Sequence, residues 1–139
     1  MEDRHARHRR SVPDRHRRPD DGFRLPTSAA FDRVVADAVA GLPAGLRRYL
    51  DGVRVATADV PPSVGHGDEV LLSRYERTST RTGWRRSRPD ERVVFFRRPL
   101  EARAHDRHDL AELIRHALVD ELAERFDLDD DRLDELGWP

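Results

Sequence analysis

The sequence has no cysteine and no lysine among its 139 residues. Without cysteine, neither a disulfide framework nor a thiolate metal site can form. All 26 basic residues are arginine, which together with abundant Ala, Asp and Pro is typical of a GC-rich genome and does not by itself predict nucleic-acid binding. No stretch approaches the ~20 apolar residues of a membrane span, and no apolar segment of a secretory signal follows the first basic residues. We therefore expect a cytoplasmic protein with no membrane partner.

Charge is unevenly distributed, although the formal net charge is only −1. Residues 1–18 hold seven arginines, three histidines and three acids, whereas residues 117–139 hold nine acids and two arginines. The first 22 residues of the chain are almost devoid of apolar side chains. We therefore predict a disordered Arg- and His-rich arm over residues 1–26 and one small domain over residues 27–139. The arm is either a solvated tail or an electrostatic attachment to nucleic acid through residues 1–22, which would make the protein an adaptor.

Hydrophobic periodicity predicts a mixed α+β domain. The expected helices cover residues 28–42, 44–50, 106–127 and 130–136, and the expected strands cover 53–58, 70–75 and 92–97. We expect loops at 63–68 and 76–91, the second containing Trp84 as either a loop anchor or a contact surface. The unbroken apolar run from Val93 to Phe96 predicts a strand that is covered on both faces, and Pro99 is expected to end it.

The long helix carries carboxylates where its apolar side should be. Its apolar residues follow the one-face spacing of a helix, at Leu110, Leu113, Ile114, Ala117, Leu118, Leu122 and Phe126. Glu121 falls near the middle of this stripe, Asp120 and Glu124 lie along one edge, and Arg125 is on the stripe side. Carboxylates facing a core are expected to be paired, to bind a metal or to take part in chemistry. This turn of the helix is therefore the candidate site.

Three interpretations compete for this turn. Glu121 and Arg125 have the i, i+4 spacing of a helix salt bridge, but Asp120 and Glu124 repel each other at the same spacing. Alternatively, Asp120, Glu124 and Asp130 could bind Mg²⁺, Ca²⁺ or Mn²⁺, which prefer oxygen ligands. A shifted metal site with His116 beside Asp120 and Glu124 is a further alternative, whereas His105 and His108 are expected to be solvated.

The third interpretation is a resemblance. Residues 116–138, with the run Asp129-Asp130-Asp131-Arg132-Leu133-Asp134-Glu135-Leu136-Gly137, are similar to the end of the minimal zincin-like metallopeptidase family that is common in actinobacteria. Upstream, Leu71–Glu76 and Val93–Leu100 are similar to the family's second and third strands, and the similarity extends over about residues 29–138. The resemblance implies a minimal zincin-like α+β fold with a small three- to four-stranded sheet packed on an active-site helix. It also implies peptide hydrolysis with zinc, bound through the motif H-E-x-x-H-x-x-G-x-x-D.

The motif is degenerate in this chain. Against the family, Asp120 and Glu124 stand in place of the two histidine ligands and Asp127 in place of the glycine. Glu121 keeps the general-base position and Asp130 the third-ligand position. The resemblance thus implies a catalytically inactive pseudo-peptidase that binds peptide or protein and needs no cofactor, with Arg125 as the counterion of Glu121 or Glu124. The alternative is an active metal-dependent peptidase with Asp120, Glu124 and Asp130 as ligands and Glu121 as base. No oligomeric state is predicted.

Overall fold

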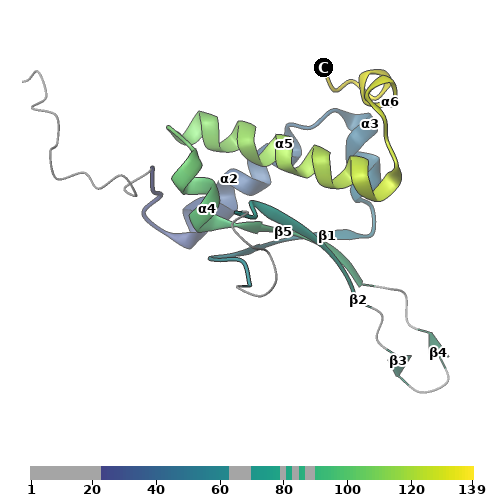
Figure 1. Ribbon diagram of the computed structural model, residues 1–139, viewed down its shortest axis with the longest axis horizontal. Helices are drawn as coiled ribbons and strands as arrows, with labels where there is room; N and C mark the ends of the chain where they lie inside the picture. The colour runs from purple at the N-terminus through teal and green to yellow at the C-terminus, as the bar shows by residue number, and fades with distance from the viewer. Residues whose placement is uncertain (1–22, 63–69, 79–80, 83–84, 87–89) are drawn as a thin grey trace, which may run out of the picture.

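The computed structural model describes residues 23–62, 70–78, 81–82, 85–86 and 90–139. They form the mixed α+β fold that the sequence predicts (Figure 1). In chain order the elements are α2 (Ser28–Ala40), α3 (Ala44–Arg47), the 3₁₀ helix η1 (Arg48–Leu50), β1 (Val53–Ala58), β2 (Ser73–Thr78), β3 (Arg81–Thr82), β4 (Arg85–Arg86), β5 (Asp90–Phe96), α4 (Arg97–Arg103), α5 (Arg107–Phe126) and α6 (Asp130–Glu135). Within these ranges, no helix is both long enough and apolar enough to cross a membrane.

The main sheet has three strands in the order β1-β5-β2. The central strand β5 runs parallel to β1, with Val55 opposite Val93, and antiparallel to β2, with Tyr75 opposite Val93. Helices α2 and α5 lie over one face of this sheet, while the short β3–β4 ladder projects away from the body of the molecule (Figure 1). Strand β2 is therefore an edge strand of the main sheet, a position that matters for the site.

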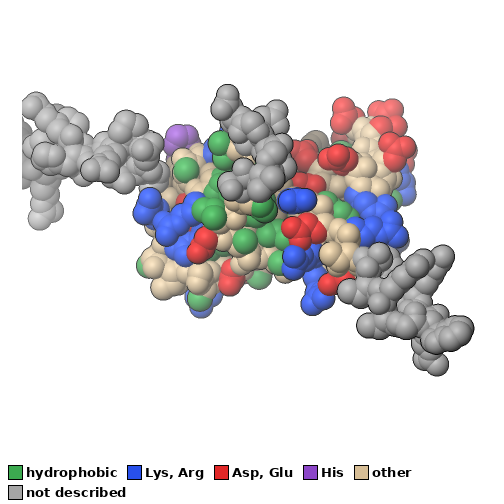
Figure 2. Space-filling view, turned by 60° about the horizontal axis from the view of Figure 1, so that its bottom comes forward, with side chains coloured by type: hydrophobic (Ala, Val, Ile, Leu, Met, Phe, Trp, Pro, Cys, Tyr) green, Lys and Arg blue, Asp and Glu red, His purple; other side chains and the backbone are tan. Residues whose placement is uncertain are grey.

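The core lies between the sheet and the helices. Its side chains come mainly from α2, β5 and α5, and include Phe31, Val34, Val35, Ala38, Val93, Phe95, Leu110, Ile114, Leu118 and Leu122. Val94 and Phe96 alternate with this set along β5 and are also buried, with 6% and 2% of their surface exposed. The prediction that β5 is covered on both faces is thus confirmed. On the side of the sheet turned partly toward the viewer in Figure 2, hydrophobic side chains reach the surface between charged ones.

Two predictions around the second strand are wrong. This strand was expected at residues 70–75 but spans Ser73–Thr78, and Val70 is 65% exposed before it. Part of the expected loop at 76–91 is also strand, because β2 continues to Thr78, β3 pairs with β4, and β5 already begins at Asp90. Strand pairing is formed by backbone hydrogen bonds, so a segment without an apolar pattern can also pair, and the hydrophobic pattern does not reveal it. Trp84 and the expected loop at 63–68 lie outside the described residues.

Helix α4 follows β5 directly and was not predicted. Pro99 does not interrupt it, because Pro99 lies in the first turn, where a helix does not need the missing N–H. Within α4, Glu101 is only 2% exposed and forms an ion pair with Arg97 at 2.7 Å. The Leu25 N–H donates to Glu101 Oε2 at 2.6 Å, and Arg97 Nη2 donates to the Leu25 carbonyl at 3.0 Å. This contact holds the chain ahead of α2 against α4.

Two residues that the sequence assigns to the N-terminal arm pack with the core of the domain. Leu25, which the predicted arm includes, is 8% exposed and belongs to the core, and Phe23 packs against it. Residues 1–22, which carry the expectation of nucleic-acid binding, lie outside the described residues.

Candidate functional site

Helix α5 presents the candidate site, and its bounds agree with the prediction. Asp106 begins the helix by accepting the Asp109 N–H at 2.8 Å. At the other end Asp127 adopts the left-handed conformation, with φ 52° and ψ 52°, and the Leu128 N–H donates to the Ala123 carbonyl at 2.9 Å. This is the helix-ending turn that usually has glycine at the left-handed position. Asp127 thus makes the left-handed turn that ends α5.

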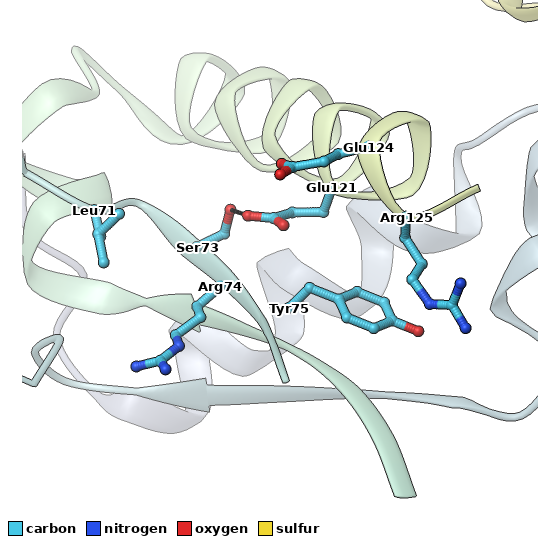
Figure 3. A pocket seen from close by; sticks show the side chains of 7 residues that line it. All are labelled: Leu71, Ser73, Arg74, Tyr75, Glu121, Glu124 and Arg125. Carbon is cyan, nitrogen blue, oxygen red and sulfur yellow. Dashed lines mark hydrogen bonds between the residues drawn. The ribbon is translucent and has the colours of Figure 1, made fainter. Parts of the chain in front are cut away.

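The last turns of α5 and the edge strand β2 enclose a cleft of about 370 Å³. Figure 3 shows the side chains around it, which come from the two elements and from Leu71 just before β2. They are Leu71, Ser73, Arg74, Tyr75, Glu121, Glu124 and Arg125. The turn of helix that the sequence singles out therefore does line a cleft.

Glu121 is half-buried and points across the cleft to β2 (Figure 3). The Ser73 hydroxyl donates to Glu121 Oε1 at 2.9 Å. Burial, as the largest cause, raises the pKa of the Glu121 carboxyl, and the charges of Glu124 and Asp120 raise it further. The bond from Ser73 and an interaction with the Tyr75 backbone N–H oppose this rise. Glu121 is thus a carboxylate held by strand β2 in a negative environment.

The outer edge of β2 carries backbone groups that point toward the cleft. The Phe96 N–H donates to the Leu72 carbonyl at 3.0 Å, which identifies Leu72 and Phe96 as a hydrogen-bonded pair. Such pairs alternate along an antiparallel ladder, so the backbone groups of Ser73, Tyr75 and Arg77 point away from β5. No described strand pairs with this edge. The interaction of Glu121 with the Tyr75 N–H is consistent with this direction.

Among the described residues, Arg125 forms its ion pair with Glu91 and not with Glu121 or Glu124, the partners that the sequence predicts. Its guanidinium donates to Glu91 Oε1 of β5 at 2.7 Å and 3.2 Å, and its carbon lies 5.8 Å from the centroid of the Tyr75 ring. Arg125, as the main cause, lowers the pKa of Glu91. Burial raises the pKa of Tyr75, and its buried hydroxyl has no hydrogen-bond partner of good geometry among the described residues, although Glu91 lies nearby. Arg125 therefore links α5 to β5 through its ion pair with Glu91.

The three expected metal-ligand positions do not come together. Asp120 and Glu124 are exposed on α5, whereas Asp130 is the first residue of α6. In the part of the chain that the structure describes, no group of three His, Cys, Asp or Glu side chains is arranged to hold a metal ion. His116 packs edge-on against Trp138, with ring centroids 5.1 Å apart, and His105 and His108 are exposed.

The sequence pattern of the zincin-like metallopeptidase family matches residues 50–138 of this chain. The chain belongs to this family. A search of curated proteins finds no match. Zinc is the metal of the family, and it prefers imidazole or thiolate ligands in tetrahedral arrangement. Positions 120 and 124 offer exposed carboxylates instead, and no third ligand joins them among the described residues, so the residues present do not fit a zinc ion.

Ser73, Arg74 and Tyr75 were not predicted as site residues. They reach the cleft only because β2 lies beside α5, and nothing in their own spacing marks them. The resemblance of Leu71–Glu76 to the family's second strand was the one available indication.

Proposed function

We propose that this member of the family is a pseudo-peptidase, which binds an extended peptide segment in the cleft between β2 and α5 and does not hydrolyse it. The observation that carries the proposal is the edge of β2. Its outward-pointing backbone groups border a cleft large enough for peptide side chains, and addition of a strand to such an edge is a common mode of peptide recognition.

The side chains at the ligand positions do not suit zinc-dependent hydrolysis. A zinc peptidase needs a metal that lowers the pKa of water and polarises the peptide carbonyl. Two carboxylates at positions 120 and 124 would add negative charge around a zinc ion and weaken its action as a Lewis acid, even if it bound. Glu121, at the general-base position, instead accepts a hydrogen bond from Ser73. Its role in this proposal is to shape the wall of the cleft.

Metal content and peptide cleavage provide the test. The purified protein, without an affinity tag, is analysed for zinc, manganese and calcium and incubated with a library of fluorogenic peptides. We expect no stoichiometric metal and no cleavage. A stoichiometric metal that is lost in Asp120→Asn, together with cleavage that Glu121→Gln abolishes, would instead establish the active carboxylate-ligated peptidase.

A restored motif provides the positive control. The triple variant Asp120→His, Glu124→His, Asp127→Gly recreates the family's two histidines and glycine beside Glu121. We expect it to bind zinc, and the same variant with Asp127 retained tests whether the glycine is needed. A folded triple variant without zinc affinity would mean that the motif is wrongly aligned with α5 or that Asp130, on α6, does not reach the metal.

A further inference from the structure

The edge of β2 separates two regions of opposite charge. Successive side chains of a strand point to opposite faces of its sheet. Ser73 and Tyr75 therefore point to the α5 side and Arg74 to the opposite side, and Figure 3 shows Arg74 directed away from Glu121. A ligand that follows this edge meets both regions.

The α5 side is negative. Glu121 and Glu124 line the cleft, and the charge of Asp120 acts on Glu121 as well. The nearby cations, Arg125 and Arg77, both pair with Glu91, at 2.7 Å and 3.8 Å. Within the described ranges, neither Asp120 nor Glu124 forms an ion pair, so their charge is available to a ligand.

The opposite side carries an available positive charge. Arg74 is exposed, lines the cleft and forms no ion pair with any residue that the structure describes. Its neighbour on the same face, Glu76, is already paired with Arg92 at 2.6 Å. Arg74 is therefore the cation that a ligand on this side would meet.

We propose that the cleft binds an extended peptide segment in which a basic residue stands next to an acidic residue. This inference rests on the proposed peptide-binding function. A strand added to β2 alternates its side chains in step with those of β2, so one side chain lies near Glu121 and Glu124 and the adjacent one near Arg74. Arginine suits the first position better than lysine because its planar guanidinium matches carboxylates. The peptide's cation thus occupies the acidic side of the cleft.

The same arrangement disfavours a nucleic acid as the ligand of this cleft. A polyanion would be attracted by Arg74 but repelled by the carboxylates at positions 120, 121 and 124. Only a ligand with charges of both signs at strand spacing satisfies both sides.

The test uses a labelled short peptide with alternating Thr and Val around a central Arg-Glu pair, and fluorescence anisotropy with the full chain. Three matched peptides replace Arg by neutral citrulline, replace Glu by Gln, or carry N-methyl groups on alternate backbone nitrogens. Exposed ion pairs contribute modestly, so each charge removal should weaken binding roughly two- to fivefold. N-methylation should abolish binding, because it blocks strand addition while keeping both charges.

Variants of the protein assign each charge to its side. Glu124→Gln should reduce the preference for Arg over citrulline and leave the preference for Glu over Gln unchanged. Arg74→Gln should do the reverse. Asp134→Asn and Arg103→Gln, which remove exposed charges on α6 and α4, should change neither preference. Circular dichroism checks that all variants are folded.

The outcomes separate the two proposals. If the peptides bind equally well whatever their charges, and only N-methylation weakens them, the charge inference is overturned and the peptide-binding function stands. If charged peptides bind but tolerate N-methylation, binding does not follow the edge of β2, and both proposals are overturned. No binding of any peptide, including peptides of a random library, also overturns both.

Discussion

Asp127→Gly should stabilise the protein, because Asp127 holds the left-handed conformation at the end of α5. This conformation costs an L-residue roughly 1–2 kcal/mol, and somewhat less for Asp. The carboxylate also lies at the negative end of the helix dipole, where its removal gains a few tenths of a kcal/mol. Against these gains, glycine loses about 0.5–1 kcal/mol more chain entropy on folding. The net expectation is an increase of about 0.5–1 kcal/mol in the free energy of unfolding.

Urea denaturation followed by circular dichroism measures this change, with a rise in Tm of roughly 2–5 °C as a second measure. Two matched variants separate the causes. Asp127→Asn removes the charge but keeps a side chain that tolerates the left-handed conformation, so it should gain only a few tenths of a kcal/mol. Asp127→Ala should destabilise. The reasoning is refuted if Ala is as stable as Gly at this position.

Three further predictions concern the carboxylates. Glu101→Leu should cost about 3–5 kcal/mol in urea denaturation, because it leaves the largely buried Arg97 unpaired; a cost below about 1 kcal/mol would contradict this. Glu91 has a lowered pKa, so its pair with Arg125 stabilises the fold above the ordinary pKa of 4.5, and this stability is lost as the pH falls through the lower folded value. Glu91→Gln should therefore lower Tm at neutral pH and have no effect in strong acid. Glu121 has a raised pKa, so the folded state holds its proton more tightly, and stability falls as the pH rises from 4.5 through the folded pKa. In Glu121→Gln this fall should disappear from the pH profile of Tm; an unchanged profile would contradict the burial of the charge.

The local elements were largely predictable because their causes are local. The spacing of apolar residues determined α2 and α5, and Asp106 supplied the cap of α5. The run Val93–Phe96 indicated a strand buried on both faces, as β5 is. The hydrophobic pattern did not predict the end of β2 at Thr78 or the strands β3 and β4, because these segments pair through their backbones without an apolar pattern. It also did not predict α4, because Pro99 lies in the first turn of that helix.

For the candidate site too, the residue types follow from the sequence and their partners from the tertiary structure. By itself, the sequence determined that carboxylates occupy the turn at Asp120, Glu121 and Glu124, and the resemblance to the family predicted that two of them stand where the family has histidines. Which groups these side chains meet was decided only by the tertiary structure, since β2 and β5 approach α5 from distant parts of the chain. In the folded chain, Glu121 accepts a hydrogen bond from the Ser73 hydroxyl and Arg125 donates to the Glu91 carboxylate. Asp130 lies on a separate helix, α6. Helical spacing sets the face on which a residue lies, but the partner across that face depends on contacts between elements that no local pattern encodes.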